Sequence, residues 1–416
     1  MAEAAAQAHT APEAPPVAKT ATFREVFADG EFRAVWLAEL ASIAGDQFAR
    51  VALTVLVYQR TGSALLTALT YAATYLPWLV GGLALSGIAD RFPRRDVMIA
   101  ADLFRMVLVG AMALPGMPLW AMVVLLFVIT TVNAPFQGAR SALRAAILPG
   151  DRYALGLALS QITRQAGIVG GFVAGGVIVA DVGVRDALLI DAGTFAFSAL
   201  MLTRVHRRPA PGGARTSQAR EMVAGISLVF ADPRLRTLML MGWLAAFYTI
   251  AEALAVPYAA HLRHGAVAAG LIFAAGPLGS AVGMAAFSRA VSPPARLRWM
   301  GPMAVGASLI LVACAARPGL VVLLVIVAVS GALAAYQVAA NAAFVTVAPD
   351  SRRGQAYGLA NAGMMLAQGL VYVMAGAAAT VARPAIVIAC VGGIGALAAL
   401  FLALGLRRLS LPARSS

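Results

Sequence analysis

Residues 86–95 read Ser-Gly-Ile-Ala-Asp-Arg-Phe-Pro-Arg-Arg. This short charged turn joins two apolar runs, residues 65–88 and 97–116. Each run has the length of about 20 residues that a helix needs to cross a bilayer. The turn carries one acid and three arginines, and arginines near a membrane are attracted to anionic lipid. The stretch therefore predicts two membrane helices joined at a cytoplasmic surface.

The composition extends this reading to the whole chain. Of its 416 residues, 61% are hydrophobic and only 12% are charged, whereas a soluble domain carries roughly a quarter charged residues. A soluble enzyme is therefore excluded. The two cysteines, both inside apolar runs, rule out a disulfide framework and a cysteine zinc site, and four histidines leave little for a histidine-based metal centre. Twelve apolar runs are predicted to span the membrane: 35–58, 65–88, 97–116, 119–139, 154–179, 186–203, 236–259, 266–288, 299–316, 319–345, 354–380 and 384–406.

The 32 basic residues are distributed unevenly among the predicted loops. The two tails and the even-numbered loops hold 24 of them, the odd-numbered loops hold 5, and three lie inside apolar runs. Membrane proteins keep excess lysine and arginine in cytoplasmic loops, so both termini are predicted to be cytoplasmic. This orientation accounts for the net charge of +14, and no nucleic-acid partner is expected.

The longest predicted loop divides the chain into two sets of six spans. Residues 145–176 are similar to residues 345–376, with Pro149 matching Pro349, which indicates a duplication. Two repeats of six helices are typical of secondary transporters, although a channel or a membrane enzyme would show similar hydropathy. The expected organisation is a disordered cytoplasmic tail (1–34), an N-terminal six-helix bundle (35–205), a linker with an interfacial amphipathic helix (206–235), a C-terminal six-helix bundle (236–406) and a second tail (407–416).

The turn at residues 86–95 resembles the conserved loop of the major facilitator superfamily, G-x-L-A-D-R-x-G-R-R. Ser86 and Pro93 replace its two glycines. The resemblance implies an all-α fold of twelve transmembrane helices in two bundles. It also implies that Asp90 latches the cytoplasmic side against the helix beginning near Gly354, whose free N–H groups favour an anion. The implied gating residues are Asp90, Arg91, Arg94, Arg95, Asp102 and Arg105.

The fifth run resembles a second motif of this superfamily, G-x8-G-x3-G-P-x2-G-G, which marks exporters that exchange substrate for protons. Its matching residues are Gly167, Gly171, Gly175 and Gly176, while Ala158 and Phe172 replace a glycine and the proline. Close packing of small residues against a neighbouring helix is the alternative reading. Residues 42–48 and 56–63, with Asp191, are similar to the branch that contains enterobactin exporters and macrolide-efflux proteins.

Ionisable residues inside the apolar runs are costly in a membrane and are functional candidates by default. Asp46 and Arg50 lie four residues apart on one helix face, so they are either a self-neutralising pair or a proton-coupling pair. Glu252 has no basic residue within four positions, so any partner must come from another helix. Asp46 and Glu252 occupy the first span of each half and are the favoured proton carriers. The candidates for proton coupling are Asp46, Glu252, Arg50, Arg164 and Asp191.

Aromatic and amide side chains interrupt the Ala, Val and Leu of the runs and could contact cargo. Aromatic walls with a few polar points suit amphiphilic molecules, although ordinary helix packing is the alternative for each residue. The cavity candidates are Tyr71, Tyr75, Trp78, Gln161, Phe247, Tyr248, Tyr336, Gln337, Asn341 and Asn361. The chain has no GxxxxGK[ST] phosphate loop, so ATP is not expected to drive transport.

The sequence thus predicts a secondary transporter of the cytoplasmic (inner) membrane, with no cofactor, no bound metal and no enzymatic reaction. We expect a monomer that exports an amphiphilic small molecule of drug, antibiotic or siderophore type against entering protons. The alternatives are an importer with the same fold and a membrane enzyme or receptor that transports nothing.

Overall fold

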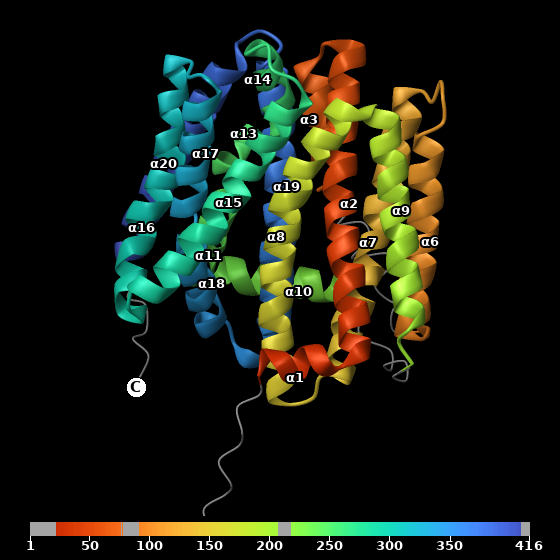
Figure 1. Ribbon diagram of the computed structural model, residues 1–416. Coiled ribbons are helices and arrows are strands. Elements are labelled where there is room, and N and C mark those ends of the chain that lie inside the picture. The colour runs from red at the N-terminus through yellow and green to blue at the C-terminus, as the bar shows by residue number, and fades with distance from the viewer. Residues whose placement is uncertain (1–21, 76, 78–90, 207–217, 409–416) are drawn as a thin grey trace, which may run out of the picture.

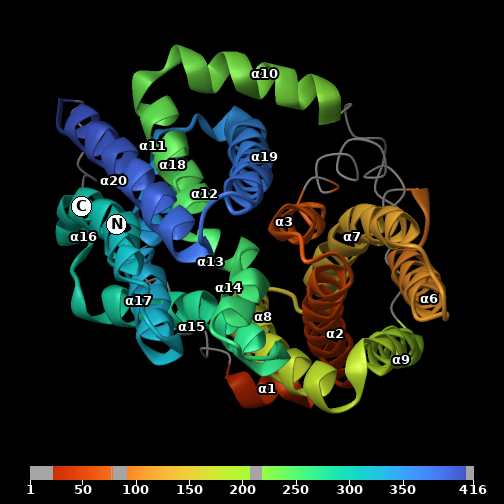
Figure 2. The same cartoon turned by 90° about the horizontal axis from the view of Figure 1, so that it is seen from above.

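The computed structural model describes residues 22–75, 77, 91–206 and 218–408, and within these ranges the chain is helical with no β-strand. Long helices run side by side (Figure 1), and from above they form two groups (Figure 2). Ten segments are long and apolar enough to cross a membrane, which confirms an all-α, multi-pass membrane architecture. The count of twelve spans remains a prediction.

The first group is formed by α2 (Gly30–Thr61), α3 (Ala64–Ala72), α6 (Arg94–Met112), α7 (Leu119–Ile147), α8 (Asp151–Asp181) and α9 (Gly183–Thr203). The second group is formed by α11 (Pro233–Trp243), α12 (Ala245–Tyr248), α13 (Ile250–Ala253), α14 (Ala255–His261), α15 (Ala266–Ala290), α16 (Pro293–Leu309), η1 (Ile310–Ala316), α17 (Leu320–Leu333), α18 (Tyr336–Val347), η2 (Asp350–Arg352), α19 (Arg353–Ala378) and α20 (Pro384–Arg408). Helix α10 (Gln218–Ala231) lies behind α8 in Figure 1 and, seen from above in Figure 2, runs along the outer edge of the molecule beside α19. We call the two groups the first and second bundles.

The beginning of the chain is more ordered than the expected tail over residues 1–34. Thr22 and Glu25 form a capping box for α1 (Phe23–Ala28), because each side chain accepts a hydrogen bond from the other residue's backbone N–H. Asp29 then caps α2. Val26 and Phe32 are fully buried against the first bundle, so apolar burial fixes this segment. The prediction of a tail up to residue 34 was wrong for residues 22–34.

Two of the predicted spans are broken in the middle. The seventh consists of α11 to α14, and the tenth consists of α17 and α18. A helix break frees backbone carbonyls, which must find new donors inside a membrane. Here the tenth span supplies them: Tyr336 donates to the carbonyl of Met241 (2.8 Å) and Gln337 donates to that of Gly242 (3.0 Å).

Candidate functional site

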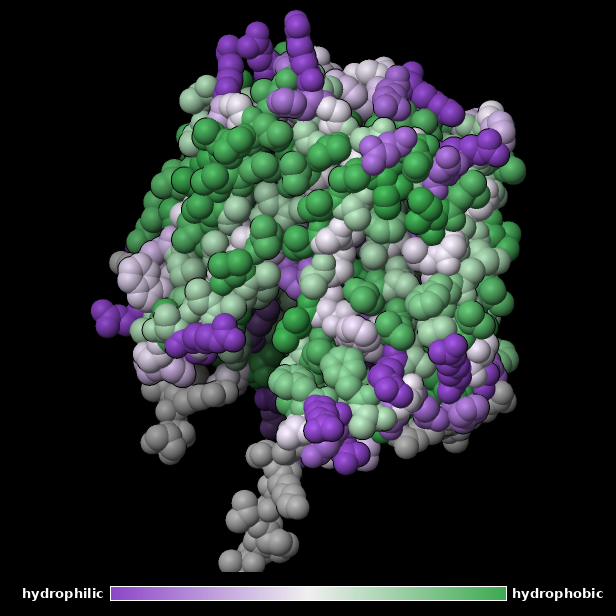
Figure 3. Space-filling model, in the orientation of Figure 1, coloured by the Kyte–Doolittle hydropathy of each residue, from purple (hydrophilic) through white to green (hydrophobic). Residues whose placement is uncertain are grey.

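A deep groove separates the two bundles on the face where α1 and α10 lie (Figure 3). On the opposite face the most extensive contacts between the bundles, among the described residues, are those of α8 with α15 and of α3 with α19. Gly176 of α8 lies so close to α15 that an added Cβ atom would be 2.8 Å from the carbonyl oxygen of Ala266. Gly376 of α19 approaches α3 in the same way, 2.5 Å from the Cβ of Ala68. The two glycines occupy matching positions in the repeat, so both halves use one device to close this face.

The glycine motif of the fifth span has two packing partners. Gly167, Gly171 and Gly175 face α2, while Gly176 faces the other bundle. Phe172, which stands where the resembled motif has proline, stacks on Phe273 of α15 with ring centroids 5.1 Å apart. These residues therefore pack helices closely, and their role in exchange remains a prediction.

Glu252 makes a polar contact that links the two bundles, as does Gln165 of α8, which donates to the backbone carbonyl of Pro277 on α15. The side chain of Glu252, on the short helix α13, is only 9% exposed. Its Oε2 atom accepts a hydrogen bond of 2.8 Å from the hydroxyl of Tyr71, on α3 of the first bundle. No salt bridge neutralises Glu252 within the described part of the chain.

Aromatic rings surround the Tyr71 end of this link. Tyr71 stacks on Phe273 at 5.2 Å and lies 5.6 Å from Tyr372, which also meets Tyr75 edge-on at 5.4 Å. The hydroxyl of Tyr372 is hydrogen-bonded to Thr249 at 2.7 Å. The sequence singled out Tyr71 and Tyr75 but missed Tyr372 and Phe273, because nothing in their own spans distinguishes them from packing residues.

A second polar centre lies within the first bundle. Asp46, Arg50, Arg105 and Asp191 come from three different spans and line one cavity of about 30 Å³, space for one or two water molecules. Asp191 is 1% exposed, and its Oδ2 atom has no hydrogen-bond partner among the described residues. No salt bridge joins Asp46 to Arg50. Both side chains line the same small cavity, and their role, as a mutually neutralising pair or in proton coupling, stays a prediction.

Gly45 allows Asp191 to approach α2. A Cβ atom at position 45 would overlap the side-chain oxygens of Asp191 and Thr194. Gly45→Ala is therefore expected to lower the free energy of unfolding by about 1–3 kcal/mol, the usual cost of overpacking. Thermal unfolding in detergent measures this change. Gly193→Ala, where nothing lies within 4 Å, is the matched control, and equal melting temperatures for the two variants would contradict the account.

Two buried ion networks brace the first bundle. Arg105 pairs with Asp102 at 2.5 Å, and Ser198 donates to the other oxygen of Asp102 at 2.6 Å. Glu39 binds Arg140 at 3.1 Å and Arg144 at 2.9 Å, with all three side chains at most 8% exposed. The sequence count placed these two arginines in a loop, which was wrong because α7 continues to Ile147. The carboxylate of Glu39 on α2 pairs with both arginines, which allows α7 to bury them.

The remaining cargo candidates are placed differently. Gln161 and Arg164 are exposed on α8, as are Asn341 on α18 and Asn361 on α19. Tyr336 is fully buried, Tyr248 is 9% exposed, and both are bonded within the second bundle. Phe247 packs against Gly395 of α20. These three aromatic residues hold the broken spans together, and their contact with cargo remains a prediction.

Part of the predicted gating loop cannot be placed. Asp90 lies outside the described residues, as does Trp78, one of the cargo candidates. Arg91 is exposed, and Arg94 and Arg95 form the first turn of α6. The latch between Asp90 and the start of α19 therefore stays a prediction.

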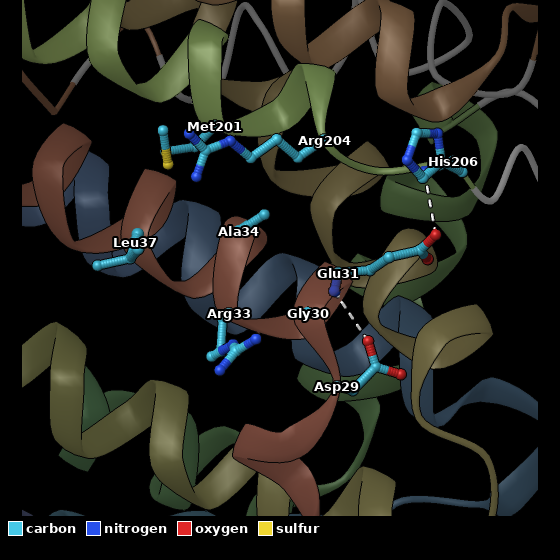
Figure 4. A pocket seen from close by; sticks show the side chains of 9 residues that line it. All are labelled: Asp29, Gly30, Glu31, Arg33, Ala34, Leu37, Met201, Arg204 and His206. Atoms are coloured by element: carbon cyan, nitrogen blue, oxygen red, sulfur yellow. Dashed lines mark hydrogen bonds between the residues drawn. The ribbon is translucent and has the colours of Figure 1, made fainter.

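A separate pocket of about 590 Å³ lies between the start of α2 and the end of α9 (Figure 4). Glu31 accepts a hydrogen bond of 3.0 Å from the backbone N–H of His206, and Asp29 caps α2 beside it. The pocket contains none of the predicted site residues. Its contacts tie the first helices of the first bundle to the end of its last helix.

Comparison with known proteins gives several relatives with matching sequences. The multidrug efflux pump Tap of Mycobacterium tuberculosis is 32% identical over 208 residues, 46% of this chain and 48% of the relative. The enterobactin exporter EntS of Salmonella typhi is 29% identical over 262 residues, 61% and 62% of the two chains. Macrolide efflux protein A of Streptococcus pyogenes is 23% identical over 141 residues, 33% of each chain. The chain thus spans about half the length of the first of these relatives.

Solved structures share the fold. A mutant peptide transporter POT in complex with sulfate has a TM-score of 0.72 at 13% identity, covering 94% of this chain and 96% of that one. An inward-facing bacterial homologue of the iron transporter ferroportin has a TM-score of 0.66 at 14% identity, covering 93% and 99%. The family model of the Major Facilitator Superfamily matches residues 35–316. Since that match covers more than half of its length, the chain belongs to the Major Facilitator Superfamily.

Proposed function

We propose that this protein exports an amphiphilic small molecule in exchange for protons, with the groove opening alternately to the two sides of the membrane. The observation that carries the proposal is the hydrogen bond between Glu252 and Tyr71, an acid and a hydroxyl on opposite bundles at their closed side. Relatives named as a multidrug efflux pump, an enterobactin exporter and a macrolide efflux protein support the outward direction.

The arginine distribution supports an orientation for this cycle. Of the 24 basic residues assigned to the side of the termini, 22 remain there once Arg140 and Arg144 are counted in α7. That side is therefore taken as cytoplasmic, so the groove opens to the cytoplasm, where cargo would enter. Ten of the twelve predicted runs are spanning segments. In this proposal the remaining two runs, which contain α3 and α6, also cross the membrane and complete a set of twelve. Helix α6 has 19 residues, including Asp102 and Arg105, which lower its mean hydropathy.

Glu252 is suited to carry the coupled proton. It is one of two acids in residues 236–416, and the other, Asp350, is exposed at the start of η2. A buried carboxylate without a cation is costly, so neutralisation by a proton is the cheap alternative. Asp46 and Asp191, in the small cavity of the first bundle, are candidates for a second protonation site.

The link to Tyr71 explains how a proton and cargo could be exchanged. A hydrogen bond to an ionised carboxylate is roughly twice as strong as one to a neutral group. When no cargo is bound and Glu252 is ionised, this hydrogen bond therefore holds the two bundles together on the side opposite the groove. Protonation of Glu252 weakens the link, and cargo in the aromatic cluster can displace Tyr71 from it. Only a protonated or a loaded carrier then reorients, which is the requirement for exchange.

Replacing Tyr71 with phenylalanine tests this link. A hydrogen bond to a charged group contributes about 1.5–3 kcal/mol, so at alkaline pH the ratio of closed to open far side should fall about tenfold or more. Spin labels on exposed Leu66 of α3 and Met374 of α19 report the separation by electron–electron resonance, with Cys390 replaced by serine.

Tyr58→Phe is the control for this experiment, because the Tyr58 hydroxyl makes no hydrogen bond among the described residues. We expect it to reproduce the wild-type distance distribution. A wild-type distribution for Tyr71→Phe as well would argue against the link as a lock.

The direction of transport is tested in everted membrane vesicles. An exporter accumulates a labelled macrolide or enterobactin when the vesicle lumen is acid, and a protonophore abolishes the accumulation. Accumulation in right-side-out vesicles with an acid exterior would instead identify an importer. The probe should be a compound to which a cell lacking the protein shows altered sensitivity. If a pH gradient has no effect on accumulation of that labelled compound, proton coupling is contradicted.

A further inference from the structure

Three loops of the second bundle converge on the face opposite α1 and α10. The end of α14, the η1–α17 turn and the α19–α20 turn enclose a cavity of about 120 Å³, enough for several waters or a small oxyanion. Its lining includes Tyr258, His261, Arg317 and Arg383, followed by Pro384 at the start of α20. None of the residues that line this cavity is assigned above to proton coupling.

The side chains that line this cavity include basic groups and no carboxylate. Arginine and histidine are its only ionisable side chains apart from a tyrosine, and residues 253–349 contain no acid. The first bundle differs on the same face, where Arg185 is accompanied by Asp181 and Asp186. Basic residues are sparse in loops away from the cytoplasm, so the convergence of two of them in one cavity is informative.

The backbone holds Arg317 toward this cavity at a cost. Arg317 has a φ of 55°, in the left-handed region that residues other than glycine rarely adopt. Its N–H donates to the carbonyl of Cys314, and the hydroxyl of Tyr258 donates to the carbonyl of Pro318 at 3.1 Å. The 25-residue helix α20 begins at Pro384 beside these groups, so its free N–H groups add positive potential.

We propose that this cavity binds the phosphate group of an anionic ligand. The guanidinium groups of Arg317 and Arg383 offer paired donors that match phosphate oxygens, and no neighbouring carboxylate competes for them. Strongly exposed apolar residues lie close in sequence on both turns, namely Val321 and Val381. They place the cavity at the edge of the apolar surface, within reach of a lipid headgroup. A soluble phosphate offers the same oxygens to the two arginines and is the other source of such a ligand.

The test uses the full chain and two probes. In one arm, nanodiscs of phosphatidylethanolamine with and without phosphatidylglycerol are dissolved, and the lipid retained by the protein is measured by native mass spectrometry. In the other arm, inorganic phosphate is titrated against delipidated protein in neutral detergent. Retention of phosphatidylglycerol identifies a lipid headgroup as the ligand, and saturable binding of phosphate alone identifies a soluble anion.

Arg317→Gly and Arg383→Gln are each expected to weaken binding about fivefold, the contribution of one arginine to anionic lipid at a surface. Arg317→Gly is expected to fold, because glycine adopts the left-handed conformation without strain. Arg185→Gln is the control on the same face and should bind like the wild type. Equal binding by the wild type and both cavity variants in both arms would overturn the proposal, as would an equal loss in Arg185→Gln.

Discussion

Glu252→Gln is expected to abolish cargo accumulation driven by a pH gradient while leaving cargo exchange at equilibrium intact. Each pH unit drives one coupled proton with about 1.4 kcal/mol, a factor of ten, so a gradient of two units supports a ratio of about 100. Glutamine fills the same space and can still accept the hydrogen bond from Tyr71, but it carries no proton. The expected ratio for the variant is therefore about 1, measured with a labelled compound in proteoliposomes.

Asp350→Asn is the matched control, because it removes the other acid of the second half from an exposed position. We expect it to retain the full gradient response. Asp46→Asn and Asp191→Asn show whether the first bundle holds a second site: a partial loss in either would indicate two coupled protons. A Glu252→Gln protein that still concentrates cargo about 100-fold would show that the proton is carried elsewhere.

Arg105→Met is expected to destabilise the protein more than any other single change considered. Arg105 is 1% exposed, pairs with Asp102, and lies between the rings of Phe136 and Phe195 at 4.4 and 4.6 Å from their centroids. Methionine fills much of the same space but leaves the carboxylate of Asp102 buried with only Ser198 to satisfy it. Leaving one partner of a buried pair costs about 3–5 kcal/mol.

The loss is measured by thermal or denaturant unfolding in detergent. The double variant Asp102→Asn with Arg105→Met should recover much of the lost stability, because it removes the stranded charge. Arg353→Met breaks an exposed pair with Asp350 and should cost about 1 kcal/mol at most. Comparable losses from Arg105→Met and Arg353→Met would contradict the assignment of Arg105 to the buried framework.

The spans could be read from the sequence because a membrane helix is specified by its own composition. Ten of the predicted apolar runs coincide with spanning segments, and Pro149 and Pro349 precede α8 and α19 as the repeat required. The start of α1 is also specified locally, because Thr22 and Glu25 have the residue types and spacing of a capping box. This signal was overlooked because the residues that precede it are rich in alanine and proline, which indicated a disordered tail.

Contacts between spans could not be read in the same way. The partner of Glu252 lies 181 positions away, and neither Tyr71 nor Tyr372 differs in type from a residue that only packs. Arg140 and Arg144 were assigned to a loop because their own segment is polar, while the carboxylate that buries them belongs to α2. Such pairings depend on how helices pack together, which one span's sequence does not encode.

Proton movement driven by cargo tests the role of Glu252 most directly. Proteoliposomes containing a pH-sensitive dye receive a cargo gradient with no imposed pH difference. In the wild type, cargo flow in one direction should move protons in the other, and a protonophore should dissipate the resulting pH change. Glu252→Gln should move cargo without any pH change. Proton movement of wild-type size in this variant would contradict the assignment of Glu252 as the coupling residue.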